Sequence, residues 1–305
     1  MKKCYGAWLF IALLITCTIS AVASSRQDIL VEVKWLQENH ARNDVLILDV
    51  REHQKYLAGH IPGAVNIPVA KTFSPHSAVA KVASLEHISG LLSRSGIRNR
   101  HFIVVYDNGR YIDAARMFWV LETYGHSRIS LLNGAWPAWV AGGFSISDNH
   151  EKRPRSKYVA RVNPDRLASK LQTHLAIYNK DKAIIDSRSK DEYVGHVSKI
   201  GRKGRIPSAI SVPHEKNFFS KDGVQKLRPN HELSSLYSPV AEADKVITYC
   251  NKGKQSSLTY FVLRGLGVDV SHYDGSWSEW GNDDTLPIER GEDKKEEANK
   301  RRHDD

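Results

Sequence analysis

Cysteine is scarce in this chain of 305 residues, which contains only Cys4, Cys17 and Cys250. Its histidine, cysteine and aspartate residues show no spacing typical of a metal site, and no glycine-rich loop of the kind that cradles phosphate occurs. The sequence therefore predicts neither a structural metal nor a nucleotide-binding loop, and we expect the protein to work without a cofactor.

Acidic residues are outnumbered, since 34 aspartates and glutamates face 44 lysines and arginines, for a formal net charge of +10. Such a charge suggests nucleic-acid binding. The basic residues are spread along the whole chain and interleaved with acids, however, and no nucleic-acid-binding motif is present. We therefore expect a solvated basic surface that attracts small anions, and no nucleic-acid partner.

Long hydrophobic runs are also absent, and the apolar stretch near the N-terminus, Trp8–Ile15, is too short to span a membrane comfortably. Lys2 and Lys3 precede it and small residues follow at 21–23, which is the pattern of a cleavable signal peptide. We predict a leader over residues 1–23, with cleavage after Ala23 and a periplasmic or secreted mature protein without stable membrane insertion. A retained N-terminal anchor is the alternative.

Cleavage would leave Cys250 as the only cysteine of the mature chain. Exported proteins fold under oxidising conditions, where cysteines usually form disulfide pairs. A single retained thiol therefore indicates a chemical role for Cys250. A buried, inert cysteine after a core strand is the alternative.

The rest of the chain consists of two similar halves. Landmarks of the first half recur in the same order in the second, 137 to 145 residues later. The pairs are Ile47–Arg51 with Ala183–Arg188, Gly59–Pro68 with Gly204–Pro213, Val104–Gly109 with Val246–Gly253, and Gly134–Trp139 with Gly275–Trp280. The sequence thus indicates an internal duplication of about 140 residues.

Each half alternates short, continuously apolar strands with helical patterns. The predicted strands of the first half are Val45–Asp49, His101–Tyr106 and Arg128–Leu132, and helical spacing covers Ile29–Glu38, Leu85–Arg94 and Asp113–Tyr124. In the second half, Asn163 is predicted to cap a helix that runs to Tyr178. Continuous apolar strands between helices are typical of parallel sheets buried on both faces. We therefore predict an α/β protein with two tandem domains, each a parallel sheet flanked by helices on both faces.

The expected domain boundaries follow from these halves. The N-terminal domain covers residues 24–147, a polar, proline-containing linker covers residues 148–157, and the C-terminal domain covers residues 158–286. Residues 287–305 carry almost no apolar side chain and are predicted to form a charged, disordered tail. The sequence predicts no particular oligomeric state.

Cys250 follows the apolar strand that begins at Val246 and precedes a helix. In parallel α/β sheets, ligands bind beyond the carboxyl ends of the strands, which is where Cys250 is expected. A loop between a strand and a helix points several backbone N–H groups at one spot, next to the positive end of the helix. The N–H groups from Asn251 to Ser256 would therefore stabilise a thiolate, the form of cysteine that attacks electrophiles.

Together, these features resemble the tandem-domain form of the rhodanese family. The residues that carry the resemblance are Asp186-Ser187-Arg188, Gly204–Pro213, Cys250–Ser256 and Gly275–Trp280, with their counterparts in the first half. The resemblance covers nearly all of residues 27 to 285 and implies a rhodanese-like fold in both halves. It also implies a sulfurtransferase, in which Cys250 takes the outer sulfur of a small anionic donor as a persulfide and passes it to cyanide or a thiol.

The loop after Cys250 holds most of the candidate donor-binding residues, which are Asn251, Lys252, Gly253, Lys254, Gln255 and Ser256. Lys252 is expected to pair with an anionic donor such as thiosulfate, and Lys254 adds to the positive field. Gly253 is expected to supply a backbone conformation that other residues avoid.

The resemblance also implies a donor-binding role for Arg188, whose guanidinium presents forked donors to an oxyanion. A salt bridge to Asp186 or Glu192 is the alternative. In the first half, Asp107 stands where Cys250 stands in the second, and a carboxylate cannot carry sulfane sulfur. That half is therefore expected to be catalytically inert.

Alternative functions differ in the donor and in the chemistry. The triplet Asn251-Lys252-Gly253 has lysine at the position typical of the family's thiosulfate-specific members, so thiosulfate is the expected donor and 3-mercaptopyruvate the alternative. A cysteine phosphatase of similar architecture needs an arginine in a longer loop, and none occurs between Cys250 and Arg264. A non-catalytic sulfur carrier or interaction module is the remaining alternative.

Overall fold

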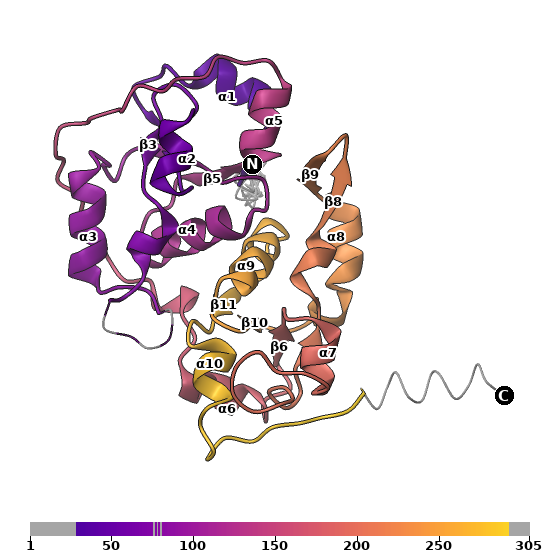
Figure 1. Ribbon diagram of the computed structural model, residues 1–305. Coiled ribbons are helices and arrows are strands. Elements are labelled where there is room, and N and C mark those ends of the chain that lie inside the picture. The colour runs from indigo at the N-terminus through magenta and orange to yellow at the C-terminus, as the bar shows by residue number, and fades with distance from the viewer. Residues whose placement is uncertain (1–28, 76, 78, 80, 293–305) are drawn as a thin grey trace, which may run out of the picture.

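The computed structural model describes residues 29–75, 77, 79 and 81–292, which fold into two α/β halves lying side by side (Figure 1). The predicted leader over residues 1–23 lies outside the described residues, as does the predicted tail after residue 292. No helix in the described ranges is long and apolar enough to cross a membrane.

A parallel sheet forms the centre of the first half. Its strands are β1 (Leu30–Val31), β2 (Val45–Asp49), β3 (Val65–Asn66), β4 (Phe102–Tyr106) and β5 (Ile129–Leu132). They are ordered β1-β5-β4-β2-β3, and all neighbours are parallel. The helices of this half are α1 (Val33–Asn39), α2 (His53–Leu57), the 3₁₀ helix η1 (Val69–Thr72), α3 (Leu85–Arg94), α4 (Ile112–Thr123) and α5 (Ala135–Ala141).

The second half repeats this plan with a smaller parallel sheet. Its strands are β6 (Lys182–Asp186), β7 (Ile210–Ser211), β10 (Lys245–Tyr249) and β11 (Val270–His272), in the order β11-β10-β6-β7. An antiparallel hairpin, β8 (Phe218–Lys221) and β9 (Val224–Leu227), is added between β7 and β10. The helices are η2 (Pro164–Arg166), α6 (Lys170–Ala176), α7 (Lys190–Val194), η3 (His214–Asn217), α8 (Asn230–Leu236), η4 (Ser238–Val240), α9 (Gln255–Gly265) and α10 (Ser276–Trp280).

Helices cover both faces of each parallel sheet, as predicted. On the outer face of the first sheet, α1, α2 and α5 pack around Leu36, Tyr56 and Trp139, while α3 and α4 contribute to the core on the other face. In the second half, α6, α7 and α10 cover the outer face around Trp277, and α8 and α9 belong to the inner core. Strands buried on both faces need apolar side chains at successive positions, which is why β2 and β4 are continuously apolar.

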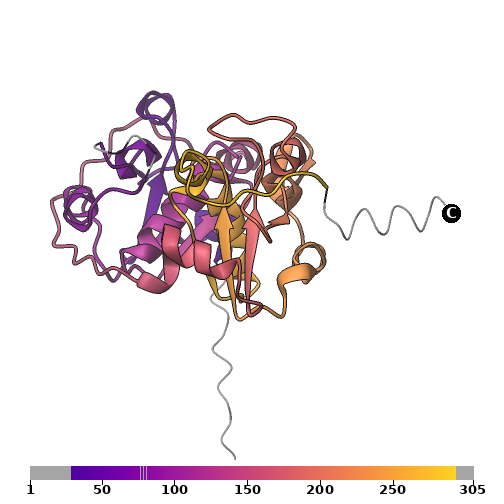
Figure 2. The same cartoon turned by 90° about the horizontal axis from the view of Figure 1, so that it is seen from below.

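The two halves meet through α4 and α9, which pack against each other in the centre of the molecule (Figures 1 and 2). Phe118 on α4 and Phe261 on α9 make an edge-to-face ring contact with centroids 5.0 Å apart. Residues of both halves belong to one continuous hydrophobic core. The halves are therefore joined by a buried apolar interface, as well as by the connecting chain.

Strand register confirms the duplication. Asp49 on β2 lies opposite Tyr106 on β4, and Asp186 on β6 lies opposite Tyr249 on β10. In each half the tyrosine hydroxyl donates a hydrogen bond to the aspartate, at 2.5 and 2.6 Å. The residues that follow the two tyrosines therefore occupy equivalent positions at the carboxyl ends of equivalent strands.

The helix predicted from Asn163 to Tyr178 is shorter in the structure. Asn163 caps only η2, after which the chain extends and bridges the sheet at Leu167. Helix α6 starts after Ser169, whose side chain forms a capping box with Gln172. The helix predicted over Ile29–Glu38 also begins later than expected. Leu30 and Val31 form β1 and pair with β5, and α1 starts at Val33.

The chain between the halves follows the first half for longer than the predicted linker, 148–157. The N–H of Tyr158 donates to Ser93, and the N–H of Asn163 donates to the carbonyl of Thr123 at 2.7 Å. The connecting segment is thus hydrogen-bonded to the first half up to the start of η2.

The predicted disordered tail is ordered at its beginning. Glu289 and Arg205 exchange two backbone hydrogen bonds, and the indole of Trp280 donates to the carbonyl of Pro287. Residues 287–291 therefore belong to the second half, because backbone pairing holds a stretch whose charged composition alone suggested disorder.

Candidate active site

Cys250 lies directly after β10, at the start of the loop that leads into α9. It is the only cysteine of the described residues and is 1% exposed. It nevertheless lines a pocket of about 450 Å³. The residues around this pocket are Ile112, Lys199, Ile200, Cys250, Asn251, Lys252, Lys254 and Gln255. Most of the loop residues predicted from the sequence therefore surround one cavity.

The carbonyl groups of the loop from Cys250 to Lys254, here called the Cys250 loop, are held by neighbouring elements. The carbonyl oxygens of Cys250 and Asn251 accept hydrogen bonds of 2.9 Å from two N–H groups at the start of α10. The carbonyl of Gly253 accepts from the hydroxyl of Ser257 at 2.8 Å and from the guanidinium of Arg116 at 3.1 Å. Gly253 has a φ of +72°, as its predicted role requires.

The N–H groups of the Cys250 loop are arranged differently. Within the described part of the chain, the N–H groups of residues 251–254 have no hydrogen-bond acceptor. Successive N–H groups left without a partner next to a helix N-terminus form a binding site for negative charge. The loop is thus suited to hold a thiolate, a persulfide or an anionic donor beside Cys250.

In the equivalent loop of the first half, backbone N–H groups donate hydrogen bonds to an anionic group. Asp107 follows β4 and its carboxylate accepts from the N–H groups of Gly109 at 2.8 Å, Tyr111 at 3.2 Å and Ala114 at 3.4 Å. Burial raises the pKa of Asp107, which the three hydrogen bonds oppose. In this half the loop therefore binds its own side chain, and no cysteine is present to carry sulfur.

Three lysines line the pocket, but they are not equivalent. Lys254 forms an ion pair of 2.8 Å with Asp113 of the first half, and Lys199 forms one of 3.3 Å with Glu192. Lys252 is exposed and has no ion pair among the described residues. Lys252 is therefore the pocket cation that is open to a donor anion.

Asn251 is held by a buried carboxylate. Its side-chain amide donates to Glu192 at 2.8 Å, and the side chain of Glu192 is 2% exposed. Burial opposes the charge of Glu192, but hydrogen bonds from Asn251 and Ser189 and the nearby charge of Lys199 keep its pKa below the usual value. Glu192 thus stays ionised and links the Cys250 loop to Lys199.

The predicted donor-binding role of Arg188 is not supported by its position. Its guanidinium makes three hydrogen bonds of 2.5–3.1 Å to Asp186, one of 2.8 Å to the carbonyl of Gly204, and lies over the ring of Trp277. It is 1% exposed and does not line the pocket. Arg51 makes the same hydrogen bonds in the first half, which has no cysteine at the equivalent position, with Asp49 and the carbonyl of Gly59. The salt bridge given as the alternative is what the structure contains.

Ser256 is also placed away from the pocket. Its hydroxyl and Nε2 of His272 are 2.8 Å apart in the interior, and both residues are fully buried. Burial lowers the pKa of His272 well below its usual value, so the imidazole is neutral. Ser256 therefore connects the start of α9 to β11 in the interior, while Gln255 beside it lines the pocket.

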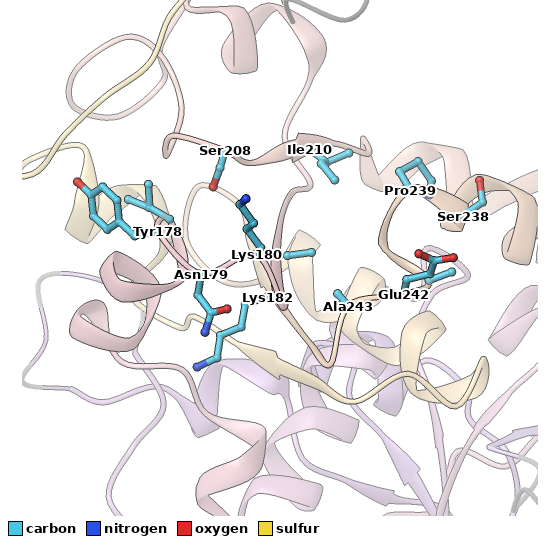
Figure 3. A pocket seen from close by; sticks show the side chains of 13 residues that line it. Tyr178, Asn179, Lys180, Lys182, Ser208, Ile210, Ser238, Pro239, Glu242 and Ala243 are labelled. Carbon is cyan, nitrogen blue, oxygen red and sulfur yellow. The ribbon is translucent and has the colours of Figure 1, made fainter.

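A larger cavity of about 670 Å³ lies elsewhere in the second half (Figure 3). It borders Lys182, the first residue of β6, and Lys180, with Glu242 on the opposite wall. Because β6 and β10 are parallel and Lys182 pairs with Lys245, this cavity and Cys250 lie at opposite ends of the sheet. No cluster of three metal-ligating side chains is found among the described residues.

The sequence prediction missed the contributions of Ile112 and Asp113, and gave Glu192 only as a partner of Arg188. Ile112 and Asp113 begin α4 of the first half, and nothing in their spacing indicates contact with a loop more than 130 residues away. Only the packing of α4 against α9 brings them to the pocket.

Comparison with known proteins agrees with this architecture. The family model of the rhodanese-like domain matches residues 32–142 and 167–283. A protein of Saccharopolyspora erythraea with the provisional name thiosulfate sulfurtransferase is 32% identical over 278 residues, covering 87% of this chain and 97% of its own. The sulfur carrier protein TtuD of Thermus thermophilus is 31% identical over 282 residues, covering 87% and 98%.

Solved structures are similar along most of the chain. SseA of Escherichia coli, described as a 3-mercaptopyruvate sulfotransferase, has a TM-score of 0.74 and 26% identity, covering 83% of this chain and 100% of its own. A single-residue variant of EanB in complex with ergothioneine has a TM-score of 0.76 and 25% identity, covering 87% of this chain and 71% of its own. A variant of EanB with a cysteine persulfide gives the same values of TM-score and identity.

Proposed function

Because this chain belongs to the rhodanese family and contains its domain twice, we propose that it is a sulfurtransferase that moves sulfane sulfur from thiosulfate to a thiophilic acceptor. The observation that carries the proposal is the position of Cys250, which lines an anion-friendly pocket at the end of β10. The equivalent position of the first half is Asp107, so sulfur transfer is assigned to the second half alone.

The proposed reaction has two displacements at sulfur. The thiolate of Cys250 attacks the outer sulfur of thiosulfate, the sulfur–sulfur bond of the donor breaks, and its electron pair leaves with sulfite. Cyanide or a thiolate then attacks the outer sulfur of the resulting persulfide, and the electron pair of the broken bond returns to Cys250. Each step exchanges one bond to sulfur for another, so no external oxidant or reductant is needed.

The surroundings of Cys250 support both steps. The N–H groups of residues 251–254 would stabilise the thiolate and the persulfide, and they are already oriented because the loop carbonyls are fixed. Lys252 would attract the sulfonate end of thiosulfate through the open side of the pocket. An exposed lysine contributes about 0.2–1 kcal/mol to such a contact.

The choice of thiosulfate over 3-mercaptopyruvate rests on Lys252, since a doubly charged donor gains more from an open cation than a singly charged one. Among the relatives, the Saccharopolyspora protein is named for thiosulfate and SseA for 3-mercaptopyruvate. 3-Mercaptopyruvate is therefore the second candidate donor. The name of the sulfur carrier protein TtuD supports sulfur carriage as a further use of the same persulfide.

The proposal is tested by measuring thiocyanate production from thiosulfate and cyanide, with 3-mercaptopyruvate as a parallel donor. We expect turnover that favours thiosulfate and that is lost in Cys250→Ser. Asp107→Asn is the matched control, because it changes the equivalent residue of the inert half and should leave kcat unchanged. Equal turnover of wild type and Cys250→Ser would contradict the proposal, and preference for 3-mercaptopyruvate would replace its donor.

Export of the protein is proposed as well, from the leader pattern over residues 1–23. Fractionation of cells that express the full chain, followed by N-terminal sequencing of the product, tests it. We expect an exported protein that starts after Ala23, and a full-length product in the cytoplasm would contradict the proposal.

A further inference from the structure

The catalytically inert half contributes directly to the pocket of Cys250. Ile112, the first residue of α4, lines the pocket, and the carboxylate of Asp113 lies 2.8 Å from Nζ of Lys254. One turn further along α4, Arg116 donates to the carbonyl of Gly253. The N-terminal part of α4 is therefore docked on the Cys250 loop, as the central position of α4 and α9 in Figure 1 allows.

Arg116 fixes α4 in this position. Its side chain is fully buried and forms an ion pair of 2.5 Å with Asp274, which follows β11 in the second half. The other carboxylate oxygen of Asp274 accepts from the N–H of Val82 in the first half, at 2.7 Å. A buried ion pair that also receives backbone hydrogen bonds is expensive to break, because each partner would be left as an unpaired buried charge. Asp113 is thus held beside the pocket.

The position of Asp113 changes the charge that a donor meets. Lys199, Lys252 and Lys254 bring three positive charges to the pocket, while Glu192 and Asp113 pair with two of them. Of the two paired carboxylates, Glu192 is buried within the second half, whereas Asp113 is partly exposed at the junction of the halves. Because the side chain of Lys254 is 41% exposed, a substitution of Asp113 changes the charge of the pocket without leaving a buried charge unpaired.

We propose that Asp113 of the inert half is a specificity-determining residue, which neutralises Lys254 and so limits the attraction of the pocket for doubly charged donors. The inference rests on the proposed sulfurtransferase function. It assigns the first half a role in donor selection through charge, beyond its role in packing. Removal of Asp113 should favour a dianion such as thiosulfate over a monoanion such as 3-mercaptopyruvate, because the interaction energy scales with the charge of the donor.

The kinetic test is a charge cycle across the ion pair. Asp113→Asn should lower the KM for thiosulfate about threefold, a modest factor because solvent partly screens the charge. The KM for 3-mercaptopyruvate should fall less, because this donor carries a single charge. Lys254→Gln should raise the KM for thiosulfate by a similar factor, and the double variant should return close to wild type. Loss of a merely structural ion pair would change KM in the same direction in both single variants, which would overturn the inference.

A second measurement reads the pocket charge without sulfur transfer. Cys250 is alkylated with anionic iodoacetate or neutral iodoacetamide, and the modified peptide is quantified by mass spectrometry. The rate with iodoacetate divided by the rate with iodoacetamide should rise in Asp113→Asn and fall in Lys254→Gln. In the double variant this ratio should return to the wild-type value. If the ratio follows this order while no variant turns over any donor, the proposed function fails and the charge role of Asp113 stands. An unchanged ratio together with unchanged KM values overturns the role of Asp113.

Glu122→Gln is the matched control. Glu122 also lies on α4 and pairs across the interface, with Arg264 of α9 at 2.6 Å, but it does not line the pocket. We expect this variant to lower the melting temperature and to leave both the KM for thiosulfate and the alkylation ratio within about twofold of wild type. A change in KM like that of Asp113→Asn would show that loosening the interface, and not pocket charge, controls donor binding, and would refute the inference.

Discussion

Substitution of Gly253 by alanine should damage both the stability and the activity of the protein. Gly253 has a φ of +72°, a conformation that costs a residue with a Cβ about 1–2 kcal/mol. A Cβ at this position would lie 2.9 Å from both the carbonyl oxygen and the carboxylate of Asp274, and 3.1 Å from the guanidinium of Arg116. Two of these contacts are closer than real Cβ atoms come, so the loop or the ion pair must shift.

The magnitude follows from adding the two effects. Crowding a tightly packed site costs about 1–3 kcal/mol, so together with the backbone strain we expect Gly253→Ala to lower the free energy of unfolding by about 2–5 kcal/mol. A shift of the Cys250 loop also moves the N–H groups that would hold the persulfide. A displacement of about 1 Å at a catalytic group can reduce the rate about 100-fold. We therefore expect kcat for thiosulfate to fall at least tenfold.

The assay combines urea unfolding with steady-state turnover, and the chain provides a matched control. Gly223, in the turn between β8 and β9, has a φ of +75°, but no atom lies within 4 Å of the point where a Cβ would stand. Gly223→Ala should therefore show only the strain, about 1–2 kcal/mol, with normal turnover. If Gly253→Ala were no less stable than Gly223→Ala and equally active, the account of the Cys250 loop would be refuted.

Three further predictions concern single side chains. Lys252→Met should raise the KM for thiosulfate about 1.5- to fivefold, the factor that corresponds to an exposed contact. Lys226→Met on β9 should not change it, and equal KM values for wild type and Lys252→Met in steady-state assays would remove Lys252 from the site. Arg188→Lys and Arg51→Lys should each lower the free energy of unfolding by about 2–4 kcal/mol with the KM for thiosulfate unchanged, since each disrupts the same buried set of contacts. A selective rise of KM in Arg188→Lys would restore its donor-binding role. Burial lowers the pKa of His101 to about 4, so the unfolded chain takes up a proton before the folded protein does, and stability should fall by about 1–3 kcal/mol as the pH drops from 6.5 to 4. His101→Gln should flatten the pH profile of urea unfolding between pH 6.5 and 4. An unchanged slope would show that His101 does not cause this loss of stability.

Much of the fold and the core of the site could be predicted from the sequence. Continuous apolar strands recur at matching positions in the two halves, and this pattern fixes both the parallel sheets and the placement of Cys250 at the end of β10. The positive φ of Gly253 was also expected, because a tight loop between a strand and a helix needs a residue that adopts this conformation. These features depend on local spacing, which a sequence displays directly.

Side-chain partners across the chain were harder to predict. The spacing of Asp186 and Arg188 is compatible with a buried ion pair or with an arginine that faces a ligand, and only burial separates the two. The repeat held the decisive signal, because Arg51 occurs at the same spacing in a half that has no cysteine. The contact of Asp113 with Lys254 had no such signal, since it arises from the packing of two helices more than 130 residues apart.

Backbone pairing in the second half also prevents a helix that the local sequence favours. Asn163 and the proline after it form a good helix start, yet the chain extends again at Leu167 to bridge β11 before α6 begins. A backbone pairing of this kind is set by tertiary structure and is not visible in the propensity of the segment. The same applies to Glu289, which pairs with Arg205 inside a stretch of charged residues.

The central claim is that Cys250 carries the transferred sulfur, and the mass of its peptide after exposure to thiosulfate tests this most directly. We predict that the Cys250 peptide gains one sulfur atom when the protein is incubated with thiosulfate, and loses it again when cyanide is added. Thiocyanate should appear in an amount equal to the sulfur lost. Turnover of thiosulfate without added sulfur on Cys250, or added sulfur that cyanide does not remove, would contradict the account.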